Sequence, residues 1–151
     1  MKHEYIADIT WESDGAPFIT GKYSRAHTWR FDCGIEVDAS ASPSVVPLPY
    51  SRADAVDPEE AFVAAISSCH MLTFLYLASK QGIDILSYHD RAVGYMEAVT
   101  GGKLAVTRVI LKPEIAYRGD APSKAAIDTL HHAAHEECFI ANSVKTDINI
   151  E

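Results

Sequence analysis

Two cysteines in this sequence are placed where thiols could do chemistry. Cys69 lies in a long apolar stretch beside Ser67, Ser68 and His70, and Cys138 falls on the apolar face of a second segment with helical spacing. Two buried helices of one small domain must lie side by side, so we expect the two thiols to approach each other. A pair of approaching thiols is typical of peroxide reduction or disulfide exchange. The alternative is that both cysteines only fill the core, as free cysteines often do.

Histidines near the second cysteine offer a different chemistry. His131, His135 and Cys138 are spaced i, i+4 and i+7, and Cys69 with His70 would approach from the other helix. These side chains are of the types that bind zinc. The helix carries neither a CxxC pair nor an HExxH motif, and partly exposed helix positions also explain the histidines. A zinc-dependent enzyme is therefore the alternative hypothesis.

A reactive cysteine also needs a cation, because a thiol with a pKa of about 8.5 is only slightly ionised at neutral pH. Arg25 and Arg30 lie in a basic and aromatic segment, and arginine stays charged when it is buried. A buried arginine needs an anion, which Glu59 or Glu60 could supply. We expect such an arginine and glutamate beside the reactive thiol.

The elements that must position these residues follow from periodicity and turn residues. Alternation predicts early strands near residues 5–11, 28–33 and 35–39, with a hairpin turn at 32–34. The later elements are two extended segments, a second helix and a last strand, over residues 84–99, 103–117, 122–143 and 144–150. The resulting order, βββ-α-ββ-α-β, predicts an α+β fold with two buried helices packed on an antiparallel sheet.

The first helix has well-marked ends. Asp57 suits the cap, Pro58 suits the first helical position, and Gly82 suits the residue that follows the helix. Its apolar residues extend almost all the way round, so we expect burial on most sides. The stretch 61–78 is long enough to span a membrane, but the polar residues at its centre favour a core helix of a soluble protein.

Composition narrows the classes of function. The 151 residues include 13 Lys and Arg against 21 Asp and Glu, giving a net charge of −8, and this length fits a single domain spanning 1–151. An acidic surface repels phosphate backbones and anionic lipid, which argues against nucleic-acid and membrane binding. Three cysteines without a recognisable signal peptide predict a cytoplasmic protein with no disulfide framework.

Two motifs resemble those of the OsmC/Ohr family of thiol-dependent hydroperoxide reductases. The run from Asp57 to Cys69 is similar to the family helix N-P-E-x-x-x-x-A-x-x-x-x-C. The run from Ala134 to Ser143 resembles the second motif, A-H-x-x-C-x-x-x-N, and the strand at 23–32 is similar to that of an OsmC-like branch. The resemblance extends over nearly the whole chain.

The resemblance implies roles for individual residues. Cys69 would be the peroxidatic cysteine and Cys138 the resolving cysteine, and Glu59 matches the glutamate that holds a catalytic arginine. Arg25 is our choice for that arginine, with Arg30 as the alternative. On a straight helix, Glu59 and Cys69 would lie about 15 Å apart on different faces. We therefore expect a break in the helix near residues 65–67.

The resemblance also implies the assembly and the partners. Family members form intertwined homodimers that build both active sites across the interface, and dithiols such as lipoyl groups often reduce them. An organic hydroperoxide would be the substrate, favoured by Phe62, Leu72 and Phe139, with no metal or organic cofactor. Cys33 is interpreted as a bystander. The alternative outside catalysis is a small-molecule binding module on the same fold.

Overall fold

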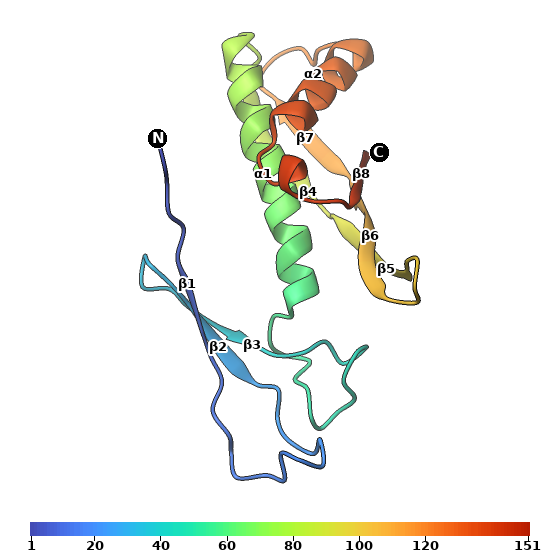
Figure 1. Cartoon of the computed structure of the whole chain (residues 1–151). Helices are drawn as coiled ribbons and strands as arrows, with labels where there is room; N and C mark the ends of the chain where they lie inside the picture. Colours follow the sequence, from blue (N-terminus) through green and yellow to red (C-terminus); the bar gives the residue numbers. More distant parts are fainter. The chain divides into compact units, whose positions relative to one another are not determined.

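The computed structural model describes the whole chain, residues 1–151, and its internal contacts divide it into two compact units. The first unit is Met1–Ala61 and the second is Phe62–Glu151. The elements follow in the order of three strands, a helix, four strands, a second helix, a short 3-10 helix and a last strand (Figure 1). The predicted α+β class with two helices is confirmed.

The first unit contains a small antiparallel sheet. Its strands are β1 (Ala7–Thr10), β2 (His27–Phe31) and β3 (Glu36–Ala39), with β2 in the centre. The turn between β2 and β3 closes with Phe31 N donating to Ile35 O at 3.0 Å, and Gly34 adopts a φ of 83°. Few residues other than glycine tolerate that conformation. The predicted hairpin at residues 32–34 is confirmed.

The long segment after β3 is closed at its base. Ser40 N donates to Val56 O, and Val56 N donates to Asp38 O, both at 3.0 Å. The hydroxyl of Ser40 accepts from Arg52 N at 3.0 Å, and Ser40 itself is buried. These bonds hold a proline-rich segment without regular secondary structure in a defined path to the first helix.

Helix α1 (Pro58–Lys80) is continuous, so the predicted break near residues 65–67 is wrong. Asp57 and Glu60 form a reciprocal cap at its start, each side chain accepting from the other's backbone N–H. At its end Gly82 has a φ of 71° and Ile83 N donates to Ala78 O at 3.0 Å, the pattern of a Schellman motif. No glycine or proline follows Pro58 within the helix, so nothing in the backbone forces a kink.

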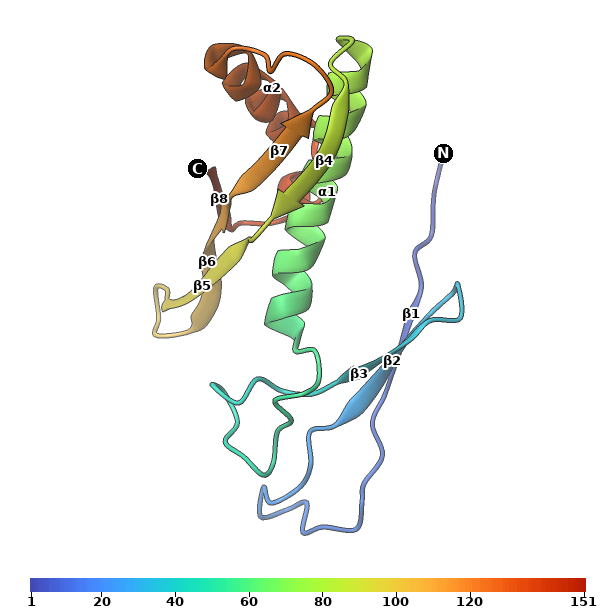
Figure 2. The same cartoon turned by 180° about the vertical axis from the view of Figure 1, so that it is seen from behind.

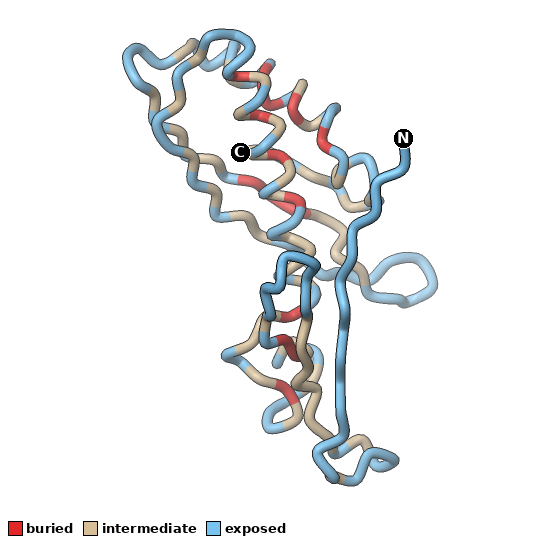
Figure 3. Tube along the Cα trace, turned by 90° about the vertical axis from the view of Figure 1, so that its left-hand side faces the viewer, coloured by how far each residue is buried: buried red, intermediate tan, exposed pale blue.

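Burial of α1 is restricted to one stripe within the chain. The buried residues recur every four positions: Ile66, His70, Phe74 and Ala78. Leu72 and Tyr76 are 61% and 57% exposed, so the expected burial on most sides is wrong for a single chain. By length and composition α1 could span a membrane, but core helices of soluble proteins meet the same criterion. Figure 3 marks the buried positions in red.

The second unit contains the predicted long hairpin, but each arm is divided into two strands. On the outer part β4 (Ile85–Asp90) pairs with β7 (Pro113–Tyr117), and on the inner part β5 (Val93–Ala98) pairs with β6 (Leu104–Leu111). The last strand, β8 (Asp147–Ile150), runs parallel to β6, so an entirely antiparallel sheet was a wrong expectation. The pairing of β8 with β6 depends on where the chain runs after the second helix. Periodicity in the sequence does not reveal that path.

A β-bulge changes which residues of β6 face the helix. The register moves between Tyr95 and Met96, whose partners are Arg108 and Val106, so one residue of β6 has no partner. Val106 therefore packs against the buried cluster that Val109 and Leu111 form with Ile66 of α1. The bulge therefore resets the alternation of side chains between the two faces of this strand.

Helix α2 (Lys124–Glu137) lies beside α1 on the same face of the β4–β7 sheet (Figures 1 and 2). The core between them contains Phe74, Ala78, Leu130 and Ala134, with Ile85 and Ile115 packed against it from the two strands. Predicted to reach residue 143, α2 instead ends at Glu137, and a 3-10 helix (Ala141–Ser143) follows. Asn142 explains the early end, because its side-chain amide donates to Glu136 O at 3.0 Å and satisfies a carbonyl of the last turn.

Candidate functional site

The two predicted cysteines lie in contact. Cys69 is in the middle of α1, and Cys138 is the residue that caps the C-terminus of α2. Their Sγ atoms are 2.8 Å apart, and both residues are free thiols. A disulfide requires sulfurs about 2.05 Å apart, so only a small movement separates this pair from a bond.

The two thiols differ in their surroundings. Cys138 is 1% exposed, whereas Cys69 is only partly buried. Burial, followed by the hydrogen bond with Cys69, raises the pKa of the Cys138 thiol. Cys138 therefore stays protonated and donates to the Cys69 sulfur, while Ala141 N donates to its own sulfur at 3.4 Å. A reagent arriving from solvent meets Cys69 first.

A buried pair of histidines joins the same two helices. Nε2 of His70 lies 3.0 Å from Nδ1 of His131, and their rings stack with an interplanar angle of 13°. Burial lowers the pKa of His70 to about 4, with further lowering by the charges of His131 and His135. Burial also lowers the pKa of His131. Both rings are therefore neutral at physiological pH.

Asp90 is a residue of the site region that sequence reasoning missed. It lies at the end of β4, where it accepts from the Ser67 hydroxyl of α1 and from Lys112 N at 2.6 Å. These bonds tie the turn of α1 that precedes Cys69 to the junction of the strands. An isolated aspartate 23 positions from Ser67 gives no signal in the sequence, because the contact exists only once the helix crosses the sheet.

The structure does not join Arg25 to Glu59. Nη1 of Arg25 donates to Gly21 O at 2.8 Å and to Tyr23 O at 2.5 Å, and the guanidinium lies 3.7 Å from the centre of the Tyr23 ring. Neither Arg25 nor Glu59 takes part in an ion pair. Arg30, the alternative, is an exposed strand residue paired with Glu36. Arg25 and Glu59 therefore do not pair with each other within this single chain.

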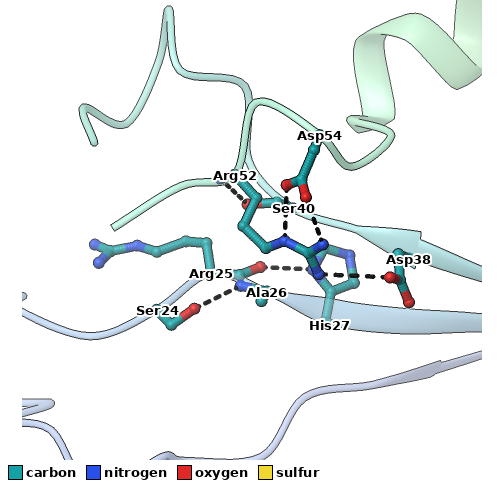
Figure 4. Close-up of polar contacts among 8 residues, drawn as sticks. All are labelled: Ser24, Arg25, Ala26, His27, Asp38, Ser40, Arg52 and Asp54. Atoms are coloured by element: carbon teal, nitrogen blue, oxygen red, sulfur yellow. Dashed lines mark hydrogen bonds and ion pairs between the residues drawn. The ribbon is translucent and has the colours of Figure 1, made fainter. Parts of the chain in front are cut away.

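A third arginine, Arg52, was not singled out from the sequence. It binds Asp54 through two hydrogen bonds of 3.0 Å each and lies 3.5 Å from Asp38. Figure 4 shows its guanidinium between the two carboxylates, while the Arg25 side chain extends away from that group. Arg52 thus contacts two carboxylates, and these contacts link the segment before α1 to β3.

An apolar cavity of about 460 Å³ lies within the first unit. Trp11, Phe18 and Tyr23 form its aromatic wall, with ring centres 4.6–5.6 Å apart. Arg25 and His27 also line it. The cavity has the mixed character of a small-molecule pocket.

The zinc hypothesis finds no support in the geometry. No three side chains of the types His, Cys, Asp and Glu come together in a way that could hold a metal ion. His131 is instead bound to His70 through Nδ1. Cys33, interpreted as a bystander, lies exposed in the turn between β2 and β3.

Comparison with known proteins identifies the family. A family model described as OsmC-like protein matches residues 51–151, so the chain belongs to the OsmC-like family. It is 50% identical to an OsmC-like protein of unknown function from Vibrio cholerae, with 99% of each chain covered and a TM-score of 0.95. No curated protein matches the chain.

More distant structures share the fold. An organic hydroperoxide resistance protein from Elizabethkingia anophelis is 17% identical, with 99% of this chain and 94% of that one covered and a TM-score of 0.73. An organic hydroperoxide resistance protein OsmC from Legionella pneumophila is 18% identical, with the same coverage and a TM-score of 0.69. At these identities the likeness establishes the fold alone.

Proposed function

We propose that this protein is a thiol-dependent peroxidase that reduces organic hydroperoxides. The observation that carries the proposal is the 2.8 Å contact between a partly exposed thiol, Cys69, and a buried one, Cys138. An approaching peroxide reaches one sulfur, and the other waits in position to capture the product. Membership of a family that includes organic hydroperoxide resistance proteins supports this chemistry.

The reaction proceeds in three balanced steps. The Cys69 thiolate attacks one oxygen of the peroxide, the O–O bond breaks, and an alcohol leaves while the sulfur becomes a sulfenic acid. The Cys138 sulfur then attacks the sulfenic sulfur, forming the S–S bond and releasing water with the Cys138 proton. An external dithiol reduces the disulfide by exchange and is itself oxidised. A lipoyl group is the reductant we propose.

The proposed enzyme is an intertwined homodimer. Exposed apolar side chains of α1, Leu72 and Tyr76, and Phe139 beside Cys138, which is 81% exposed, are the surfaces that a second chain would cover. Arg25 and Glu59 remain the proposed catalytic ion pair, to be completed in that assembly. The two free thiols suit the reducing cytoplasm, where we place the protein.

Peroxide consumption with a defined donor tests the proposal. Purified protein is given cumene hydroperoxide with dihydrolipoamide, thioredoxin or glutathione as reductant, and peptide mass spectrometry follows one equivalent of oxidant. We expect turnover with dihydrolipoamide and a Cys69–Cys138 disulfide. A Cys33–Cys69 linkage, or no turnover with any donor, contradicts the assignment.

A binding module is the second candidate. The aromatic cavity of the first unit favours it, because a pocket of about 460 Å³ with one arginine at its wall suits a small apolar anion. Titration of the Cys69→Ser variant with a fluorescent apolar carboxylate measures binding without catalysis. Tight binding together with a lack of peroxidase activity in the unaltered protein would favour this function.

A further inference from the structure

Apart from the thiol contact itself, the contact between His70 and His131 is a directional link between the two helices that carry the thiols. The 3.0 Å nitrogen–nitrogen distance is a hydrogen bond, and both residues are buried, at 1% and 7% exposure. The core between the helices contains apolar residues such as Phe74 and Leu130. Apolar contacts do not depend on direction, so they permit sliding that a hydrogen bond opposes.

The histidines occupy matching places relative to the thiols. His70 follows Cys69 directly in α1, and His131 precedes Cys138 by seven residues, two turns along the same face of α2. We propose that His70 and His131 are a positioning pair that holds α2 on α1 at the register in which Cys138 meets Cys69. This inference rests on the proposed peroxidase function, because disulfide formation is the step it serves.

The pair has one arrangement of protons that leaves the fewest groups unsatisfied. Nδ1 of His70 is buried and has no hydrogen-bond partner. If Nε2–H of His70 donates to Nδ1 of His131, the unpartnered Nδ1 of His70 carries a lone pair and no hydrogen. The opposite arrangement would bury an N–H group without an acceptor, which native structures avoid. His70 is therefore the donor and His131 the acceptor.

The groups around the pair explain why it works in the neutral state. His135 and Asp128 of α2, Asp90 at the end of β4, and the buried hydroxyl of Tyr88 in β4 are its titratable neighbours. Asp90 is the anion that could compensate a charged ring, but it already accepts from Ser67 and Lys112. A proton on His70 would place a charge and an unpaired N–H in the core.

Solvent nevertheless reaches one ring of the pair. A cavity of about 590 Å³ is lined by His131 together with His132, His135 and Lys124. Protons can therefore exchange at His131 without unfolding. Acid should loosen the pair, and with it the position of Cys138, while the exposed thiol of the site stays accessible.

The competition between two fates of the Cys69 sulfenic acid reports on the position of Cys138. In one, the S–S bond forms, the S–O bond breaks and water leaves with the Cys138 proton. In the other, a second hydroperoxide molecule transfers oxygen to the sulfenic sulfur, giving a sulfinic acid and an alcohol. Misplacing Cys138 slows only the first, so the sulfinate fraction rises.

Matched variants separate positioning from packing. His70→Leu and His131→Leu remove the hydrogen bond and keep apolar bulk, whereas His70→Gln and His131→Asn replace the bonding nitrogens with an amide N–H donor and a carbonyl acceptor. Leu130→Val is the control, because it alters the apolar core between the same helices and keeps both histidines and the Phe74 ring that stacks on His131. Each variant is treated with cumene hydroperoxide, and mass spectrometry gives the ratio of sulfinate to disulfide at Cys69.

We expect the ratio to rise about tenfold in the Leu variants of the histidines, to return towards normal in the Gln and Asn variants, and to change little in Leu130→Val. The rate of the first oxidation of Cys69 should stay within about twofold of normal in all of them. An unchanged ratio in folded Leu variants, or no recovery in the amide variants, overturns the proposal. If the Leu variants do not fold, the ratio of sulfinate to disulfide is measured in the unaltered protein from neutral pH to the acid limit of folding. A ratio that stays constant over this range overturns the proposal.

Equilibration with reduced and oxidised glutathione makes failure of this proposal distinguishable from failure of the proposed function. That measurement gives the effective concentration of Cys138 towards Cys69 without any peroxide. A protein that consumes no hydroperoxide but loses effective concentration in the Leu variants retains the positioning pair and loses the peroxidase assignment. An effective concentration that is the same in all variants removes the positioning pair, whatever the peroxidase activity.

Discussion

The two units of the chain differ in how they position the residues of the predicted site. Nine of the ten buried apolar residues belong to Phe62–Glu151, and Ala39 is the single one in Met1–Ala61. In the second unit, Cys69, Cys138 and the two buried histidines are fixed by contacts between helices. In the first unit, the arginines satisfy themselves locally, on backbone carbonyls, on Glu36 or on Asp54.

This difference between the units indicates which part of the predicted site a single chain forms by itself. The thiol pair needs nothing beyond its own unit, because α1 and α2 bring the sulfurs together. The arginines of the first unit, by contrast, contact no thiol within that unit. Both units expose large apolar side chains, among them Tyr5 at 91% in the first and Phe139 at 81% in the second. Exposed apolar surface is costly in water, and a second chain that covers it is what we propose for the homodimer.

The largest expected effect is on the thiol pair of the second unit. Cys69→Ser should lower peroxidase turnover by about three orders of magnitude or more, because a hydroxyl is a far weaker nucleophile than a thiolate. Cys138→Ser should still allow one oxidation, after which Cys69 accumulates as sulfinic acid. Turnover assays and peptide mass spectrometry measure both effects. Cys33→Ser, an exposed thiol of the first unit, is the control and should keep full activity.

The second prediction concerns the apolar surface of α1. Tyr76→Glu places a charge on a residue that is 57% exposed in the single chain and that a partner would cover. We expect the unaltered protein to have twice the 16.5 kDa chain mass in light scattering and the variant to dissociate at micromolar concentration. Gln81→Glu, at an exposed residue directly after the same helix, adds the same charge and is the matched control. A folded, active monomer of the unaltered chain would contradict the assembly.

The third prediction uses the buried histidines. The pKa of His70 is about 4 in the folded protein and about 6.5 when unfolded, so the unfolded chain binds more protons between these values. The contribution of His70 to the free energy of unfolding should therefore be fully present above pH 6.5 and fall by up to about 3 kcal/mol towards pH 4. Urea titrations at a series of pH values measure the slope.

Replacement of that histidine should flatten the pH dependence. His70→Gln cannot be protonated, so its stability curve should lose most of the decrease in this range. His89→Gln, an exposed histidine of β4, should leave the curve unchanged. Equal slopes in the His70 variant and the unaltered protein would show that the pair does not remain neutral in the fold.

Sequence patterns predicted those parts of the structure that depend on local chemistry. The start of α1 at Asp57–Pro58, its end at Gly82 and the hairpin at Gly34 each follow from residues within a few positions of one another. The contact of Cys69 with Cys138 followed from two apolar helix faces that must pack together. The bond between Asp90 and Ser67, and the pairing of β8 with β6, depend on residues far apart in the chain.

The wrong expectations share a physical cause. A break in α1 was inferred so that one arginine could serve both Glu59 and Cys69, and no backbone signal demanded it. Burial of α1 on most sides was inferred from composition, which does not distinguish cover by the same chain from cover by a partner. Both inferences depended on contacts with distant segments, which local sequence patterns do not specify.

The smallest expected effect is at Asn142, which ends α2 before Cys138. Its amide donates to Glu136 O at 3.0 Å, so Asn142→Ala removes one exposed side-chain hydrogen bond and should cost about 1 kcal/mol of unfolding free energy. Cys138 lies between the two bonded residues and has an extended backbone with a ψ of 116°. Once the Asn142 bond is lost, we expect α2 to extend into residues 138–140 and to draw the Cys138 sulfur away from Cys69. We therefore expect disulfide formation after one equivalent of hydroperoxide to slow several-fold, with Thr129→Ala, on the exposed side of α2, as the matched control. Stopped-flow measurement of the disulfide step checks this, and an unchanged rate at reduced stability would limit Asn142 to capping the helix.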